Sequence, residues 1–266
     1  MQDGNAVAWD RVDEQRRVAG SRENGLKRVF DILEYLHSVQ RPVAIGDLAR
    51  GTNAPRSTTY SLVRILAEAD LLKLSGDGVY FGPKLYLYGM DYMRGNDLLR
   101  RGRQEVDMLA RETGETSEMC LLQSGRATIV HSSPGTRPLR IGSAIGQQAP
   151  LPWTACGRLL LAGCDRTKIE AMVSDADLVL PDGRRLLLDD FLDDIAAARG
   201  AGYSVMTGLV ETNTKCLAAP VFSAPGHVEA TIGLVIPIET GEARIDELVA
   251  LLRGRAAILS IATVPN

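Results

Sequence analysis

The stretch that decides the N-terminal fold is PVAIGDLARGTNAPRSTTYSLVRILAEADLLKLSGDGVYF, residues 42–81. After Pro55, apolar and polar residues each recur at i, i+3, i+4 and i+7, the spacing of two opposite faces of a helix. The apolar face consists of Thr59, Leu62, Val63 and Leu66, and the polar face of Ser57, Tyr60, Ser61 and Arg64. Pro55 suits the first helical position, because its missing N–H would have no partner there. The pattern predicts a helix with one face in a core and the other face free.

Shorter elements flank this helix. An amphipathic run from Ile45 to Ala49 precedes it, and a Thr-Asn-Ala-Pro turn separates the two. After the helix, Leu71-Leu72-Lys73-Leu74 and Val79-Tyr80-Phe81 flank Ser-Gly-Asp-Gly, a glycine-containing hairpin turn. A further helix is expected upstream from an apolar stripe of Leu26, Val29, Phe30, Leu33 and Leu36. Three helices and a two-stranded wing together predict a winged helix-turn-helix.

A winged helix-turn-helix presents a narrow polar ridge to the major groove of DNA. Pairs of helices joined by a turn also occur in proteins that never touch DNA, and the pattern alone leaves this alternative open. The free face favours DNA, because it carries arginines, hydroxyl groups and a tyrosine and has no acidic residue before Glu68. The residues expected at bases or phosphates are Arg56, Ser57, Thr58, Tyr60, Ser61, Arg64, Lys73 and Ser75.

Composition and charge narrow the class of protein. At 266 residues, with 45% hydrophobic and 24% charged residues, the chain suggests two globular domains. A net charge of −3 argues against indiscriminate polyanion binding, but it leaves room for a locally basic surface. The cysteines form no CxxC pair and the histidines show no metal-ligand spacing, so we expect no metal and no cofactor. Neither a signal peptide nor a long apolar run occurs, which favours a cytoplasmic protein that does not contact the membrane.

The chain is expected to have four parts. Residues 1–22 are polar and charged and are expected to be a mobile arm, and residues 23–83 form the winged helix-turn-helix domain. Residues 84–112 are expected to be a linker helix, whose apolar content favours pairing with a second subunit. In residues 113–266, strand-like runs, one of them at 139–141, alternate with helices. This alternation predicts an α+β domain with an antiparallel sheet flanked by helices.

Three segments resemble those of an IclR-family transcriptional regulator. They run from Ile45 to Leu85, from Leu151 to Ala162 and from Arg199 to Phe222, and they include IGDLA, YFGPKL, LPWTACGRLLLA, RGAGY and CLAAPVF. All three occur in order, and the resemblance extends from about Leu26 to the C-terminus. It implies an N-terminal winged helix-turn-helix, a linker helix and a C-terminal GAF-like domain that binds a small effector. It also implies homodimers, which often assemble as dimers of dimers.

The chain departs from the family pattern at several positions. The recognition helix usually carries an arginine after the aromatic or histidine position, and here that residue is Ser61, so one DNA contact is lost. The Gly-Lys of the second segment is Gly157-Arg158, which keeps the positive charge. Helix caps that are often Ser or Thr are Ala44 and Ala54, so these helix ends are expected to be held less firmly.

The resemblance also implies where the effector binds. The turn that opens the second segment would offer backbone N–H groups near Ala155 and Cys156 to an anion. The residues implied at the effector are Trp153, Thr154, Ala155, Cys156, Met206, Thr214, Cys216, Gly233 and Val235. Since several of them are apolar, we expect a small ligand with one polar or anionic end, such as a short semialdehyde, a lactone-derived acid or an aromatic acid. Cys216 is either an effector contact or a buried structural thiol.

These observations predict a DNA-binding transcriptional regulator and not an enzyme. We expect a repressor of a catabolic operon that binds a palindromic double-stranded operator and is released by a small effector. One alternative is a dimeric ligand-sensing or interaction module that has lost DNA binding, for which Ser61 is the support. Another is an enzyme with Cys216 as nucleophile and His131 or His227 as base, although no nucleophile-elbow motif, G-x-G-x-x-G or P-loop occurs.

Overall fold

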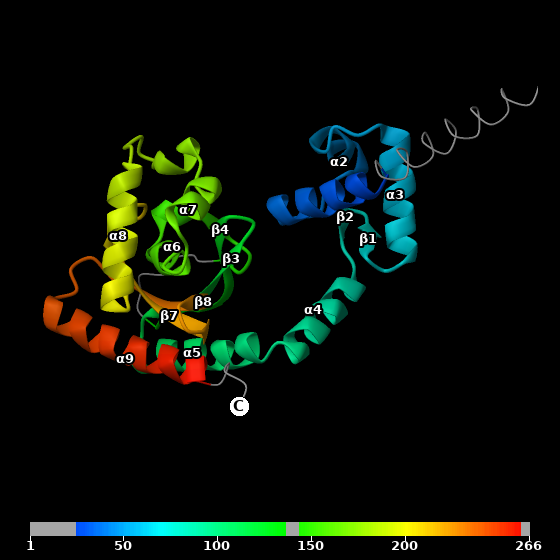
Figure 1. The fold of residues 1–266 in the computed structure, drawn as a ribbon. Helices are drawn as coiled ribbons and strands as arrows, with labels where there is room; N and C mark the ends of the chain where they lie inside the picture. The colour runs from blue at the N-terminus through cyan, green and yellow to red at the C-terminus, as the bar shows by residue number, and fades with distance from the viewer. Residues whose placement is uncertain (1–24, 137–143, 262–266) are drawn as a thin grey trace, which may run out of the picture. The chain divides into compact units, whose positions relative to one another are not determined.

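The computed structural model describes residues 25–136 and 144–261 of the chain (Figure 1). The chain divides into two compact units, with the boundary between Tyr92 and Met93. The predicted N-terminal arm and the predicted strand at 139–141 lie outside the described residues. Among the described residues, no helix has the length and apolar character that a bilayer span requires.

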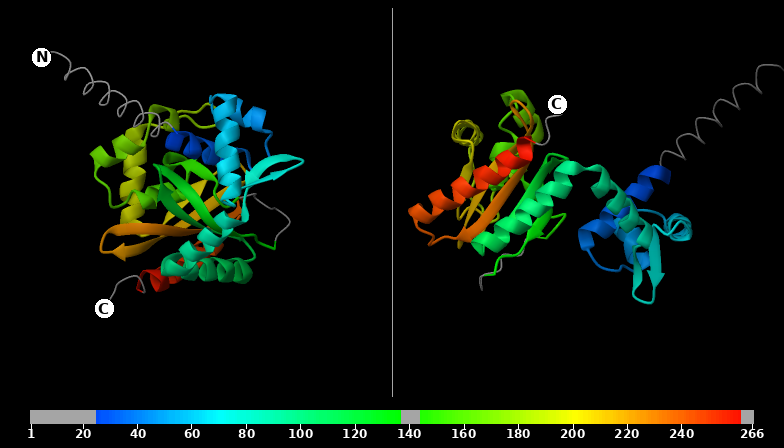
Figure 2. Two further views of the ribbon diagram at one scale, coloured as in Figure 1. Left: turned by 90° about the vertical axis from the view of Figure 1, so that its right-hand side faces the viewer. Right: turned by 90° about the horizontal axis from the view of Figure 1, so that it is seen from below.

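The first unit is a winged helix-turn-helix. Its helices and strands are a helical segment at 25–39, α2 (Ile45–Gly51), α3 (Arg56–Glu68), β1 (Leu72–Ser75), β2 (Gly78–Phe81) and α4 (Pro83–Gly95). The strands β1 and β2 pair antiparallel with Ser75 opposite Gly78, so the turn of the wing consists of Gly76 and Asp77. Figure 2 shows this hairpin projecting from the helices.

One hydrophobic core joins the helices to the wing. Its buried members are Ile32, Leu36, Val43, Leu48, Val63, Leu66, Leu72 and Val79. The backbones of Val43 and Val79 exchange two hydrogen bonds of 3.0 and 2.8 Å, which attach the segment before α2 to the wing. Gly78 has a φ of +125°, and a Cβ there would lie 2.5 Å from the carbonyl oxygen of Val43, so the junction requires glycine.

The start of α3 differs from the prediction by one residue. The helix begins at Arg56, and Pro55 is its N-cap, because the ψ of Pro55 is 134° and therefore extended. Pro55 thus does not occupy the first helical position, and Ala54 is not the cap. The first helical hydrogen bond runs from the Thr59 N–H to the Pro55 carbonyl, at 3.0 Å. At α2 the predicted N-cap is confirmed: Ala44 has no side-chain cap.

Two helices of the first unit leave apolar side chains in solvent. In the helical segment at 25–39, Ile32 and Leu36 are fully buried, whereas Leu26 and Phe30 are each 64% exposed. The predicted apolar stripe was therefore wrong at these two positions. None of the 13 residues of α4 is buried. Its exposed large apolar side chains are Tyr86, Leu87, Tyr88, Met90 and Tyr92.

The second unit has an α+β fold. Its elements are α5 (Asp97–Thr113), β3 (Thr116–Gln123), β4 (Arg126–Ser133), β5 (Gln148–Pro150), α6 (Ala155–Leu160), α7 (Arg166–Met172), α8 (Leu188–Ala201), β6 (Ser204–Thr207), β7 (Thr214–Ala224), β8 (His227–Pro237) and α9 (Glu242–Ile261), with short 3-10 turns at Leu151–Trp153 and Asp175–Leu178. Within the described residues, six strands form one antiparallel sheet in the order β5-β4-β3-β8-β7-β6. The segment expected as one linker helix consists of α4 and α5, which are separated at Asn96. The Asn96 side chain caps α5 by accepting a hydrogen bond from the Leu99 N–H.

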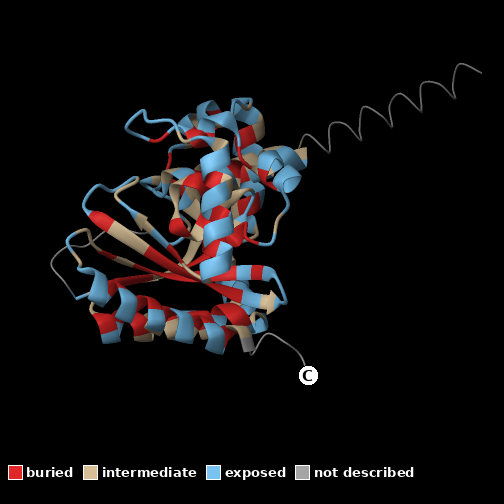
Figure 3. Cartoon of the chain, turned by 60° about the vertical axis from the view of Figure 1, so that its left-hand side comes forward, coloured by how far each residue is buried: buried red, intermediate tan, exposed pale blue. Residues whose placement is uncertain are grey.

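Helices cover both faces of this sheet. On one face, α5 and α9 lie side by side and pack on residues such as Leu217, Ile232 and Leu234 (Figure 2). Arg255 of α9 joins the two helices through ion pairs with Glu105 at 3.0 Å and Glu112 at 2.5 Å. On the other face, α6 packs on β7 and α8 packs against α6, in a cluster that contains Ala155, Leu159, Ala198 and Ala218. Figure 3 shows the buried residues gathered on the strands and on the helix sides that meet them.

Candidate functional site

The helix α3 holds its polar face in solvent. Thr59 and Val63 are buried against the core, whereas Tyr60 is 54% exposed and the Arg64 side chain is 69% exposed. The Arg64 guanidinium lies 3.0 Å from the carboxylate of Glu68, one turn further along. An exposed i,i+4 pair of this kind is weak, so Arg64 remains available to another anion. Of the residues predicted at DNA, Thr58 is half-buried and the others are exposed: Arg56, Ser57, Tyr60, Ser61, Arg64, Lys73 and Ser75.

The second unit contains a cavity of about 310 Å³ between the sheet and the chain around the start of α6. All nine residues predicted at the effector line it: Trp153, Thr154, Ala155, Cys156, Met206, Thr214, Cys216, Gly233 and Val235. The structure therefore brings them together, and their role in ligand binding stays a prediction. Further lining residues that the sequence did not single out include Glu118, Cys120, Ile129, Gln147, Gln148 and Glu211.

Strand register explains why Glu118 and Cys120 belong to the cavity. Glu118 pairs with Gly233 across β3 and β8, and Cys120 pairs with Thr231. Side chains alternate between the two faces of a sheet, so these positions share the face that lies away from α5 and α9. The intervening Met119 belongs to the core under those two helices. The alternation of side chains between the two faces of the strand could have identified Glu118 and Cys120 as lining residues from the sequence, once Met119 was assigned to the core.

Hydrogen bonds occupy the polar groups of two lining residues, Trp153 and Thr154. The Trp153 indole Nε1 donates to the backbone carbonyl of Asp177 at 2.7 Å, so its polar edge bonds to protein. The Thr154 hydroxyl accepts from the Gly157 N–H at 2.8 Å and caps α6. One of the backbone donors at this helix start is therefore already used. Trp153 and Thr154 thus contribute mainly shape and apolar surface to the cavity, because their polar atoms are already hydrogen-bonded to protein.

A buried arginine fixes the same turn to α8. The Arg158 guanidinium donates to Asp194 on α8 through two hydrogen bonds of 2.9 and 2.7 Å. It also donates to the carbonyl oxygens of Pro152 at 3.3 Å and Thr154 at 3.0 Å, and it lies 5.4 Å from the Phe191 ring. Nearly all of its donors have partners, so Arg158 positions the chain between the 3-10 turn at Leu151–Trp153 and α6.

The thiol of Cys216 is held in its neutral form. Burial, with a smaller contribution from the Glu118 carboxylate, raises the pKa of Cys216 to about 12. A nucleophilic cysteine requires the opposite shift and a nearby base. His131 instead bonds to Asp107 on α5 at 2.8 Å, and His227 begins β8; neither lines the cavity. This geometry gives no support to the hypothesis of a Cys216 enzyme. Within residues 25–136 and 144–261, no group of His, Cys, Asp and Glu side chains could hold a metal ion.

Comparison with known proteins assigns both units. Residues 25–75 match the IclR helix-turn-helix domain, and residues 90–261 match the bacterial transcriptional regulator IclR C-terminal domain. The chain belongs to the IclR family. It is a DNA-binding transcriptional regulator, as the family resemblance of the sequence implied.

Individual relatives agree with this assignment over most of the chain. The transcriptional regulator KdgR of Escherichia coli is 27% identical over 237 residues, covering 88% of this chain and 90% of KdgR. The IclR regulator structure from Alicyclobacillus acidocaldarius has a TM-score of 0.80 and 20% identity, over 90% of this chain and 98% of that one. An IclR homolog from Microbacterium hydrocarbonoxydans, solved with 4-hydroxybenzoate, has a TM-score of 0.76 and 21% identity over 90% and 98% of the two chains. These two structures share the fold of this IclR-family chain.

Asp177 supports Trp153, which lines the cavity. It is 7% exposed, its carboxylate lies 2.5 Å from the Arg126 guanidinium, and it accepts hydrogen bonds from the Ser174 N–H at 2.9 Å and hydroxyl at 2.7 Å. Burial acts to raise the pKa of Asp177, but the bonds from Ser174 and Arg126 outweigh burial, so the pKa is lowered. Its backbone carbonyl at the same time holds the Trp153 indole.

The Asp177→Asn variant should therefore unfold more easily than the wild type at neutral pH. The stabilisation from a carboxylate with a lowered folded-state pKa is present above the pKa of an unfolded Asp, about 3.9, and is lost as the pH falls through the folded-state value. Urea unfolding followed by circular dichroism from pH 7 to pH 3 should show the difference between variant and wild type shrinking toward acid. Asp175→Asn is the matched control, because Asp175 pairs with Arg185 at the surface. A difference that stays constant with pH would contradict the role assigned to Asp177.

Proposed function

We propose that this IclR-family regulator is a repressor of a catabolic operon, that it binds a palindromic operator as a homodimer, and that a small effector in the cavity of the second unit releases it. The observation that carries the proposal is the division of α3 into a buried side, with Thr59 and Val63, and a free polar side, with Tyr60 and Arg64. Repression is supported by relatives such as the transcriptional repressor IclR and the repressor AllR of Escherichia coli.

The residues of α3 and the wing take different parts in this proposal. Ser57, Thr58, Tyr60, Ser61 and Arg64 meet bases and phosphates in the major groove, and Arg56, Lys73 and Ser75 meet the DNA backbone. Effector and operator oppose each other through one coupling free energy, so each weakens the binding of the other by the same factor. A hundredfold release corresponds to about 2.7 kcal/mol of coupling.

The Arg64→Ala variant should bind the operator about 5- to 150-fold more weakly, a loss of about 1–3 kcal/mol for a base or phosphate contact. The operator is found first by footprinting the wild type on the DNA next to its gene, and affinities are then measured by fluorescence anisotropy at one fixed salt concentration. Arg100→Ala is the matched control, since Arg100 is an exposed arginine that pairs with Asp97 on α5. Equal operator affinity of the wild type and Arg64→Ala would remove α3 from the DNA interface.

The effector is a small molecule with a largely apolar body. The cavity volume of about 310 Å³ is at the lower end of the range for ligand pockets. Val235 and Met206 contribute apolar side chains, and Cys216 is held as a neutral thiol. Short or aromatic acids and aldehydes meet this description. The 4-hydroxybenzoate bound by the Microbacterium homolog supports an aromatic acid as the first probe.

The Val235→Phe variant should lose the response to the effector and keep operator affinity, because the added ring fills the cavity while α3 stays unchanged. Differential scanning fluorimetry with 4-hydroxybenzoate and a series of short carboxylates and aldehydes measures binding, since a ligand of the native state raises the unfolding temperature. Val205→Phe is the control, because Val205 lies on the edge strand β6 outside the cavity lining. An undiminished shift in Val235→Phe for a ligand that stabilises the wild type would place the effector elsewhere.

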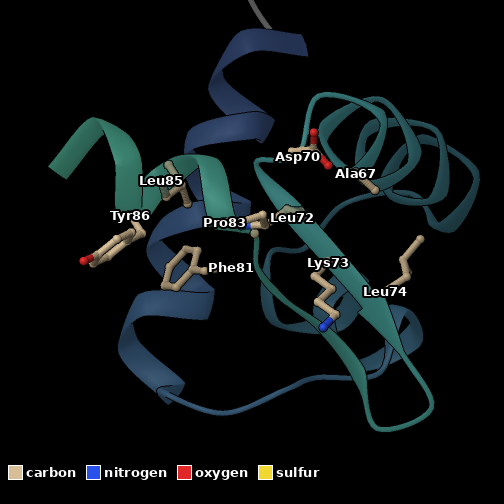
Figure 4. Close-up of a pocket in the computed structure, with 10 residues that line it drawn as sticks. Ala67, Asp70, Leu72, Lys73, Leu74, Phe81, Pro83, Leu85 and Tyr86 are labelled. Atoms are coloured by element: carbon tan, nitrogen blue, oxygen red, sulfur yellow. The ribbon is translucent and has the colours of Figure 1, made fainter. Parts of the chain in front are cut away.

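The first unit offers apolar surface for a second subunit. None of the residues of α4 is buried against the described parts of the chain, and Leu26 and Phe30 are also exposed. Phe81, Leu85 and Tyr86 lie beside an open hollow where the wing meets the start of α4 (Figure 4). The volume of this hollow is about 910 Å³. A contiguous exposed apolar surface of this kind is usually covered in the assembly. Pairing through this surface gives the homodimer, and with it two reading helices for a palindrome.

Leu87→Asp should raise the dissociation constant of the dimer at least about tenfold, which corresponds to about 1.4 kcal/mol. A charge placed on an apolar interface loses its hydration when the subunits meet. Sedimentation velocity over a concentration series measures the assembly. Leu187→Asp is the control, since Leu187 is 61% exposed and Leu87 57%, but Leu187 lies before α8 in the second unit. If Leu187→Asp and not Leu87→Asp shifts the equilibrium, α4 is not the dimer surface.

A further inference from the structure

The second unit contains another cavity, which is separate from the effector cavity. Its volume is about 260 Å³, and it lies where the end of α6, the end of α8 and the hairpin of β7 and β8 meet. Among the described residues, the two cavities have no lining residue in common. An apolar cavity of about 150 Å³ is enough to bind benzene, so this space is large enough for a six-membered ring with a short substituent.

The floor of this second cavity is apolar. Leu159, Ala198 and Val228 line it, and none of these three residues is more than 8% exposed. Gly163, which also lines it, holds the end of α6 close to the hairpin, since a Cβ there would lie 2.3 Å from the carbonyl oxygen of Gly226. The cavity is therefore a fixed feature of the packing between α6 and the sheet, and the part of a ligand that enters it is apolar.

Positive charge lies at the rim of the second cavity. Arg199, in the last turn of α8, is exposed and is the one charged residue among the described lining residues. The Arg253 guanidinium is also close, because a Cβ at the lining residue Gly202 would lie 3.6 Å from its Nη2 atom. Neither arginine forms an ion pair with another described residue. An apolar cavity with guanidinium groups at its rim suits a carboxylate, which accepts charge-assisted hydrogen bonds from guanidinium.

We propose that the second cavity binds a small carboxylic acid with an apolar body, and that α6 couples its occupancy to the effector cavity. The apolar body lies against Leu159 and Val228, and the carboxylate accepts hydrogen bonds from Arg199. A neutral amide of the same shape keeps the apolar contacts and loses the charge, so the acid binds more tightly than its amide.

The helix α6 contacts both cavities. It has six residues; Ala155 and Cys156 in its first turn line the effector cavity, whereas Leu159 near its end lines the second. Ala155 and Leu159 belong to one packed cluster with Ala198 and Ala218. A ligand that displaces Leu159 therefore also displaces Ala155, because closely packed side chains transmit the shift along so short a helix. The binding site goes beyond the proposed function, and only the regulatory meaning of the coupling rests on it.

A methyl NMR titration of the full-length chain, labelled at its Ala, Leu and Val methyl groups, reports on the two cavities separately. The probe is cyclohexanecarboxylate at constant pH and ionic strength. In the wild type, the methyl signals of Ala162 and Val228, which line the second cavity, should shift and saturate. In Val235→Phe, in which the added ring fills the effector cavity, the Ala155 signal should still shift with the same midpoint as Ala162. An Ala155 signal that stays in place there would overturn the coupling.

The role of charge is measured on the wild type, so it does not depend on how well a variant folds. Cyclohexanecarboxamide should bind the second cavity at least about fivefold more weakly than the acid. Arg199→Gln should weaken binding of the acid by a similar factor. Arg111→Gln is the matched control and should leave it unchanged, because Arg111 is an exposed arginine in the last turn of α5 and does not line the cavity.

Three results would overturn the site. One is the absence of saturable shifts at Ala162 and Val228, and another is equal affinity for the acid and the amide or for the wild type and Arg199→Gln. The third is a set of shifts confined to Val235 and Leu217, which line the effector cavity. That last result would overturn the second site and leave the proposed function intact, whereas shifts at Ala162 and Val228 without any at Val235 and Leu217 would support the second site alone.

Discussion

The alternation of side chains along β3, β8 and β7 is the constraint on which the second unit depends. One set of positions, including Met119, Leu217 and Ile232, is buried under α5 and α9. The other set, including Cys216 and Val235, faces the cavity beside α6. Both sets of side chains face the correct side only if the strand register is fixed, because a slip of one residue would turn the core side chains toward the cavity and the cavity side chains toward the core. The tightly packed face therefore secures the register that shapes the cavity on the other.

In the first unit, the rotation of the helix α3 about its axis has the role that strand register has in the second. The core under α3 is small, and it fixes the rotation of the helix through Val63 and Leu66. That rotation leaves Tyr60 and Arg64 in solvent, where they gain nothing for folding. The wing is held to the same core through the two backbone hydrogen bonds between Val43 and Val79. Core packing in this unit thus sets the direction in which Tyr60 and Arg64 point, although these two side chains do not stabilise the fold.

The sequence predicted the elements whose residue pattern is periodic and bounded. The two faces of α3 were predicted residue by residue, and the hairpin of the wing followed from its turn. The edge strands β5 and β6 are too short for the sequence to predict, because four or fewer residues without a marked turn give no clear alternation. Phe30 was placed in the core because periodicity records apolarity, and an exposed apolar helix face has the same pattern as a buried one. The error at Pro55 has a backbone cause, since the ψ of an N-cap cannot be deduced from composition.

The hydrogen bonds of Trp153 and Thr154 have a consequence for changing what this regulator senses. These two residues frame the cavity, yet their polar atoms are committed to Asp177 and Gly157, and Arg158 ties their turn to α8. Substitutions of Trp153 or Thr154 that are meant to change ligand preference would therefore also break hydrogen bonds that hold the turn before α6. Val235 lies on β8, whose other face is packed under α5 and α9 through Leu234 and Ile236, so a biosensor with altered ligand preference is better built by varying Val235 while Trp153 and Thr154 stay unchanged.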